Sequence, residues 1–130
     1  MVTPAQRKGR RAEVEAATRL ADATGWPVRR RQQEGRADDT GDLEGVPYTC
    51  VQVTAIENLS SALSRKLPAL ADQQARARAP YGLLWVRRRG GRCIAVMSER
   101  QLAAMLTAAV AYLRLAEGAT ALGLYVPDEP

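Results

Sequence analysis

The chain has 130 residues, enough for one domain with a hydrophobic core, and 46% of them are apolar and 25% charged, as in water-soluble globular proteins. It has no histidine and two cysteines, Cys50 and Cys93, which excludes a structural zinc site and is typical of reduced core thiols in an intracellular protein. It lacks both an apolar run of about 18 residues and the apolar stretch of a secretory signal, so we expect a cytoplasmic protein with no membrane partner.

The net charge of +5 is unevenly distributed. Residues 1–31 carry eight basic and three acidic side chains, residues 32–57 carry one basic and six acidic, and residues 65–92 carry eight basic and one acidic. An acidic segment therefore lies between two basic ones. A nucleic-acid-binding protein with a metal site would need this layout, with arginines for the phosphates and a local group of carboxylates for the cation. Solvated surface charge would also produce it.

The first third of the chain predicts a helix and then strands. An apolar stripe that includes Leu20 predicts a helix from Ala5 to about Thr24. Glu13 lies on this inward stripe, where a carboxylate needs a partner because burying an unpaired charge is costly; the alternative is an edge position that reaches water. Strands are expected next over residues 28–33, 41–46 and 49–56.

The middle of the chain predicts a second helix and a hairpin. Leucines at helical spacing indicate a helix over residues 59–79, which Pro68 either kinks or divides. An apolar strand over residues 81–87, a turn at residues 90–91 and a returning strand over residues 93–97 follow.

The C-terminal part predicts a third helix. Ser98 is typical of an N-cap, and the helix should reach about Glu117 before a short strand over residues 122–126. The order helix, three strands, helix, two strands, helix indicates a single α/β domain. Its core should comprise residues 5–117, with residues 118–130 as an extension.

Residues 41–58, GDLEGVPYTCVQVTAIEN, contain the candidate catalytic chemistry. Asp42 follows a glycine, and the chain then turns into an apolar strand. Metal-dependent nucleases present a carboxylate in this way, followed on the strand by an acid-x-lysine pair. The two positions of that pair are occupied here by Gln52 and Thr54.

Several short motifs in this order resemble the PD-(D/E)XK nuclease superfamily, and most closely the small Holliday-junction-resolvase-like proteins of phages of actinobacteria. The resemblance covers most of residues 7–100 and implies a restriction-endonuclease-like fold with a mixed central sheet flanked by helices. It also implies a protein, often dimeric, that cuts branched or duplex DNA with Mg²⁺ inside the bacterial host cell. The motifs are GRRAE (9–13), GWPVRRR (25–31), GDLEGVP (41–47), VQV (51–53) and APYGLLWVRRRGG (79–91).

By this resemblance Glu13, Asp42 and Gln52 are the metal-linked residues, and Thr54 takes the position of the catalytic lysine. Glutamine supplies an amide oxygen without a charge, so Mg²⁺ or Mn²⁺ should bind weakly, and activity should need Mn²⁺ more than Mg²⁺. Threonine cannot replace the ammonium charge, and losing such a group typically costs about 10²–10³ in rate.

Three nearby residues are candidate substitutes for the missing groups. Lys66 or Arg65 on the second helix could supply the positive charge, and Glu57 could supply the acid. The alternative for Glu57 is an exposed position at the end of the strand.

Arginine clusters are the candidate DNA contacts, because arginine binds phosphate oxygens with two donors. The first turns of the first helix contain four cations, Arg7, Lys8, Arg10 and Arg11. The helix dipole disfavours cations at this end of a helix, so their presence favours a phosphate-binding role. The other two clusters are residues 29–31, on a predicted strand, and residues 87–89, at the hairpin. Side chains alternate between the two faces of a strand, so at most two of the three arginines at 29–31 can share a face. The predicted DNA-binding residues are Arg10, Arg11, Arg29, Arg31, Arg87, Arg88 and Arg89.

Three functions remain open at this point. The first is a metal-dependent endonuclease of Holliday-junction-resolvase type with weak activity. The second is a catalytically inactive nuclease fold that binds DNA or a protein. The third is an unrelated α/β interaction protein whose charges are incidental, and the order of the motifs makes it the least favoured.

Overall fold

A computed structural model describes residues 1–32 and 39–123. The chain separates into two compact units, Met1–Met97 and Ser98–Pro130, and each is described by itself. The elements are α1 (Pro4–Thr24), β1 (Arg29–Arg30), β2 (Leu43–Glu44), β3 (Thr49–Thr54), α2 (Leu59–Ala77), β4 (Tyr81–Arg87), the 3₁₀ turn η2 (Arg89–Gly91), β5 (Cys93–Val96) and α3 (Glu99–Ala121).

The predicted order of helices and strands is confirmed, and so is the α/β class with a mixed central sheet. The main difference is that β1 and β2 contain two residues each, far fewer than predicted, and that residues 33–38 lie outside the described part of the chain. Residues 124–126 of the last predicted strand lie outside it too. The restriction-endonuclease-like fold and the single domain with a C-terminal extension stay predictions.

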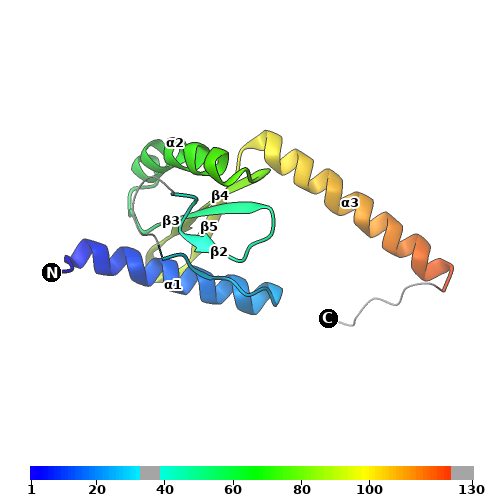
Figure 1. The fold of residues 1–130 in the computed structure, drawn as a ribbon, viewed down its shortest axis with the longest axis horizontal. Coiled ribbons are helices and arrows are strands. Elements are labelled where there is room, and N and C mark those ends of the chain that lie inside the picture. The colour runs from blue at the N-terminus through cyan, green and yellow to red at the C-terminus, as the bar shows by residue number, and fades with distance from the viewer. Residues whose placement is uncertain (33–38, 124–130) are drawn as a thin grey trace. The chain divides into compact units, whose positions relative to one another are not determined.

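The sheet of the first unit has the strand order β1-β2-β3-β4-β5. β3 and β4 are parallel, and the other neighbouring pairs are antiparallel. α2 provides the crossover that a parallel pair requires. Figure 1 shows the sheet between α1 and α2. The site described below lies where the end of β3 meets both helices.

Local sequence signals explain the boundaries of α1. The Thr3 side chain accepts a hydrogen bond from the backbone N–H of Gln6, and the Gln6 side chain accepts one from the Thr3 backbone N–H, which forms a capping box. Pro4 occupies the first helical turn, where its missing N–H costs nothing. Gly25 ends the helix in the left-handed conformation, with φ of 74°.

Two apolar clusters form the core, one on each face of the sheet. Alanines of α1 pack closely against one face because small side chains let the helix approach the strands. α2 covers the opposite face through Leu70. The α1 cluster contains Ala12, Ala16, Ala17, Val28, Leu43, Val51 and Val53, and the α2 cluster contains Cys50, Leu70, Leu84 and Val86.

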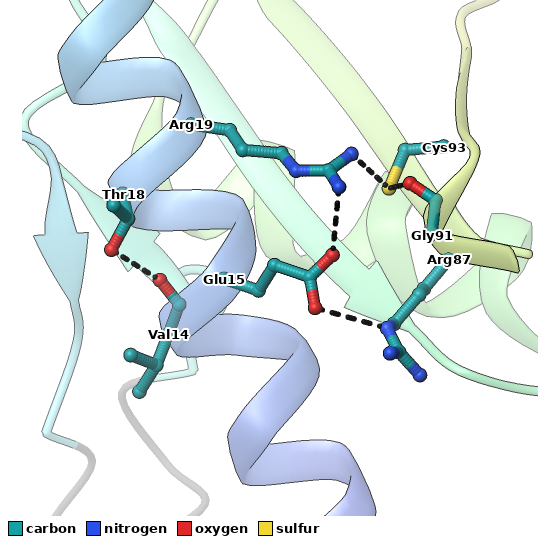
Figure 2. A network of polar contacts seen from close by, with 7 residues as sticks. All are labelled: Val14, Glu15, Thr18, Arg19, Arg87, Gly91 and Cys93. Carbon is teal, nitrogen blue, oxygen red and sulfur yellow. Dashed lines mark hydrogen bonds and ion pairs between the residues drawn. The ribbon is translucent and has the colours of Figure 1, made fainter.

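The two cysteines have different environments. Cys50 is buried in the α2 cluster, as predicted for a core thiol, and donates to the Thr40 carbonyl oxygen at 3.1 Å. Cys93 is half-buried on β5 and accepts a hydrogen bond from Arg19 at 3.2 Å (Figure 2). Both are free thiols.

The second unit is dominated by α3. Ser98 caps this helix by accepting from the backbone N–H of Gln101, as predicted. Within the described residues, α3 is the one helix long and apolar enough to cross a membrane by length and composition, with a mean hydropathy of 1.3 over an 18-residue window. The core helix of a water-soluble protein has the same properties, so the absence of a membrane partner stays a prediction.

Candidate functional site

A pocket of about 500 Å³, here called the Asp42 pocket, lies at the C-terminal end of β3. It brings together every residue predicted for catalysis or metal binding, from four separate segments of the chain. α1 contributes Glu13, the segment before β2 contributes Asp42, and β3 contributes Gln52 and Thr54. The remaining lining residues are Ala5, Lys8, Gly9, Val53, Ala55, Ile56, Glu57, Arg65 and Lys66.

Asp42 is held against β3 by two hydrogen bonds of 2.8 Å. Its backbone N–H donates to the Val51 carbonyl oxygen, and its Oδ2 accepts from the Val53 N–H. Gly41, with φ of 107°, makes this approach possible, because a Cβ there would lie 2.8 Å from the Val51 oxygen. The second carboxylate oxygen of Asp42 has no hydrogen bond within the described residues.

The pKa of Asp42 is raised from 3.8 to about 6, and burial is the largest cause. The nearby carboxylates of Glu13 and Asp39 contribute to this rise, whereas the Val53 N–H and the positive charge of Lys66 oppose it. Asp42 is therefore a carboxylate whose ionisation is opposed by its surroundings, and a cation beside it would remove that opposition.

Glu13 is half-buried and already has a positive partner. Its Oε2 accepts from Nε of Arg30 on β1, and the two side chains form an ion pair. This pair supplies the partner that the sequence requires for an acid on the inward stripe of α1. Glu13 therefore adds negative potential at the pocket, but its charge is largely offset by Arg30.

Gln52 and Thr54 are both buried, with exposed fractions of 6% and 4%. The Oε1 atom of Gln52 is buried without a hydrogen-bond partner among the described residues. Such an orphaned acceptor is costly unless something donates to it or coordinates it. The Thr54 hydroxyl oxygen accepts from the Ile56 N–H at 3.3 Å, so this hydroxyl stabilises the end of the strand.

Three cationic residues line the Asp42 pocket: Lys8 from α1, and Arg65 and Lys66 from α2. Lys66 is half-buried, and its charge acts on the carboxylate of Asp42. Of the substitutes predicted for the missing lysine, Lys66 therefore has the support of this electrostatic contact.

Glu57 lines the same pocket but is exposed and paired with other cations. It lies 3.6 Å from Nζ of Lys8 and 3.3 Å from Nη2 of Arg89, and the hydrogen bond from Arg89 lowers the pKa of Glu57. The Arg88 side chain also donates to the Glu57 carbonyl oxygen at 2.6 Å. This environment fits the alternative of an exposed residue beyond the strand better than the substitute acid.

The fit of the pocket to a divalent cation is partial. One carboxylate oxygen of Asp42 and the orphaned Gln52 Oε1 are hard oxygen ligands of the kind that Mg²⁺ and Mn²⁺ bind. Within residues 1–32 and 39–123, no three Asp, Glu, Cys or His side chains form a group that could hold a metal ion. The donor set is therefore low in charge.

No family model matches the chain, and neither does any curated protein or solved structure. The resemblance to PD-(D/E)XK nucleases thus stays a prediction. The same holds for its implications, namely Mg²⁺ or Mn²⁺, DNA, a homodimer and a cytoplasmic location.

The predicted DNA-binding arginines divide into paired and unpaired groups. Arg29 and Arg31 lie on one side of their segment and both pair with Glu44, whereas Arg30 turns to Glu13, as the alternation of a strand requires.

The hairpin arginines are paired as well. Arg87 pairs with Glu15 at 3.1 Å, while Arg88 and Arg89 contact Glu57. Arg10 and Arg11 are exposed and make no ion pair within the described residues. The pair of Arg89 with Glu57 is exposed and contributes little to stability, so a phosphate could displace the Glu57 carboxylate from Arg89.

The contribution of Lys8 to the Asp42 pocket could not be recognised from the basic cluster alone. Helical spacing offers the signal: Ala5, Lys8, Gly9, Ala12 and Glu13 follow the pattern i, i+3, i+4, i+7, i+8, which indicates a shared face. In the sequence, Lys8 belongs to a basic cluster whose other members, Arg7, Arg10 and Arg11, are exposed.

Proposed function

We propose that the protein is a metal-dependent endonuclease of branched DNA, of the Holliday-junction-resolvase type, with weak activity. One observation carries the proposal: a half-buried carboxylate with a raised pKa, Asp42, shares a pocket with the orphaned amide oxygen of Gln52 and with the cation Lys66. Perturbed carboxylates beside unpaired polar atoms in a pocket are typical of catalytic sites.

Asp42 and Gln52 would hold the Mg²⁺ or Mn²⁺ ion. The cation, when bound, supplies Lewis-acid stabilisation of negative charge on the scissile phosphate. Lys66 would offset part of the same charge, the role that a strand lysine has in the nucleases that this chain resembles. Glu13, held by Arg30, contributes negative potential at the pocket.

This division of roles explains why activity should be weak. The ligand set has one full carboxylate, and the substitute cation is on a helix instead of the strand. Mn²⁺ binds oxygen and nitrogen sites more tightly than Mg²⁺ does and tolerates imperfect geometry better, so it should support more activity. Equal turnover with both ions would contradict the account of a weakened ligand set.

The experiment is a cleavage assay on a labelled four-way DNA junction and on a linear duplex of the same sequence. Each substrate is incubated with Mg²⁺, Mn²⁺ or EDTA, using the natural chain and Asp42→Ala. We expect junction cleavage that depends on the divalent cation and disappears in Asp42→Ala. Absence of cleavage in all conditions, with the natural chain folded, would refute the proposal.

A second candidate function is a nuclease fold that binds DNA without cutting it. The observation that favours it concerns Thr54, which is buried and whose hydroxyl accepts a hydrogen bond from the Ile56 N–H. Because threonine takes the place of the lysine, β3 supplies no cation to the pocket. Tight, salt-sensitive junction binding without cleavage would support this second function.

A further inference from the structure

A second and larger pocket, of about 890 Å³, lies beside the N-terminal half of α1. It is here called the α1 pocket. Five of its lining residues are cationic and one is acidic, so its walls carry a strong positive charge. The lining residues are Pro4, Arg7, Lys8, Arg10, Arg11, Val14, Glu15 and Arg87.

The positive charge of this pocket opposes the local helix dipole. The first turns of a helix favour acidic side chains, yet the first turn of α1 contains none, and Arg7, Lys8, Arg10 and Arg11 follow directly. Of these four, only Lys8 makes an ion pair within the described residues. The charge is therefore available to an external anion.

Glu15 holds one wall of the pocket in position. Its carboxylate lies 3.1 Å from Nε of Arg87 on β4 and 3.2 Å from Nη2 of Arg19. Figure 2 shows this carboxylate between the two arginines, with the Arg87 side chain extending from the strand toward α1. The bridge fixes the Arg87 guanidinium in the pocket wall and offsets only part of the positive charge.

The α1 pocket and the Asp42 pocket share Lys8 as a lining residue. Its ammonium group is paired with Glu57, which also lines the Asp42 pocket. An anionic chain that occupies the α1 pocket would therefore lead past Lys8 to the Asp42 carboxylate.

We propose that the α1 pocket binds the phosphates of a single-stranded segment of the nucleic-acid substrate, next to the bond that would be cut in the Asp42 pocket. The identity of the ligand rests on the proposed function. A concave pocket fits a flexible single strand better than the convex surface of a duplex. Val14 and Pro4 offer apolar contacts to sugars or bases between the cations.

The test is fluorescence anisotropy with a labelled single-stranded oligonucleotide and a blunt duplex of equal length, in EDTA and at several salt concentrations. The variant is Arg7→Gln with Arg11→Gln, two exposed residues of the pocket. The matched control is Arg78→Gln with Arg114→Gln, which removes the same charge from the C-cap of α2 and from α3. Circular dichroism verifies that both double variants fold.

We expect the pocket variant to lose at least about tenfold in affinity for the single strand. The magnitude of its slope of log K against log salt should be smaller by about 1.4, because each of the two lost phosphate contacts contributes about 0.7. The control should stay within about twofold of the natural chain, because diffuse charge alone contributes little specific contact.

Three results would overturn the inference: equal affinity of the pocket variant and the natural chain, equal losses in pocket variant and control, or pocket-dependent binding of the duplex but not of the single strand. Binding in EDTA separates this inference from the proposed endonuclease. Pocket-dependent binding by a protein that never cuts would support the inference and refute the nuclease. Cleavage by the natural chain, together with unchanged binding by the pocket variant, would support the nuclease and refute the inference.

Discussion

Replacing Asp42 with asparagine should stabilise the fold at neutral pH, although it removes the central carboxylate of the candidate site. The pKa of Asp42 is raised from 3.8 to about 6, mainly by burial. Since one pKa unit is worth about 1.4 kcal/mol, keeping this carboxylate ionised in the folded protein costs about 3 kcal/mol. Asparagine avoids this cost and keeps an oxygen that can accept from the Val53 N–H.

The sign follows from proton linkage. The folded protein binds the Asp42 proton more tightly than the unfolded chain does, so the stability from this group is complete below a pH of about 3.8 and is lost as the pH rises through about 6. About 2 of the 3 kcal/mol disappear between about pH 4.5 and about pH 7.5. The advantage of Asp42→Asn over the natural chain should therefore grow by this amount over the same interval.

Urea denaturation, followed by circular dichroism in EDTA at both pH values, measures the effect. With an m-value of about 2 kcal/mol/M, the gap between the two midpoints should widen by about 1 M at the higher pH. Asp72→Asn, which removes an exposed carboxylate from α2, is the matched control and should show no such widening. Parallel pH dependence of Asp42→Asn and the natural chain would refute the reasoning.

Divalent cations provide the second arm of this experiment. Mn²⁺ at ten times its dissociation constant should raise the free energy of unfolding of the natural chain by about 1.4 kcal/mol at about pH 7.5. Asp42→Asn should gain much less, because the ligand charge is gone. An equal gain in both proteins would show that the cation binds elsewhere.

Three further substitutions test the same pocket. Gln52→Glu should lower the Mg²⁺ concentration needed for half-maximal cleavage, since it adds a charged ligand, and an unchanged titration would remove Gln52 from the ligand set. Lys66→Gln should slow cleavage by about 10²–10³ at saturating cation if Lys66 offsets charge on the phosphate; a rate within about twofold of the natural chain would exclude that role. Gly41→Ala should destabilise the fold by about 1–3 kcal/mol, because the residue has φ of 107° and its Cβ would meet the Val51 oxygen at 2.8 Å; a thermal melt with an unchanged midpoint would contradict this.

The regular parts of the fold were predictable because their patterns are long. The apolar run of β4 and the stripe of α1 predicted the correct elements, and the residues singled out around Asp42 lie in one pocket. The lengths of β1 and β2 were not predictable. A strand ends where pairing with its neighbour ends, and β2 shares a single register pair, Leu43 with Val51, with β3.

The ion pairs formed by the site residues were harder to predict than which residues line the pocket. Sequence spacing brings Glu13 to the inward face of α1, but its pairing with Arg30 depends on a strand contact between residues far apart in the chain. Likewise, the sequence indicates free cations at the hairpin arginines, whereas in the fold they contact Glu15 and Glu57. Long-range pairs of this kind leave no local signal.

The alternation of β3 restricts how a site of this kind can change during evolution. Val51 and Val53 belong to the α1 cluster, so a cation introduced at either position would enter the core, although Val53 also borders the pocket. Gln52 and Thr54 are the polar residues of β3 that line the pocket. Once Thr54 lacks a charge, a charge can be restored without burying it in the core either at that same position or from a neighbouring helix. α2 crosses back over this face of the sheet, so Lys66 needs no rearrangement of the strands to take over the role.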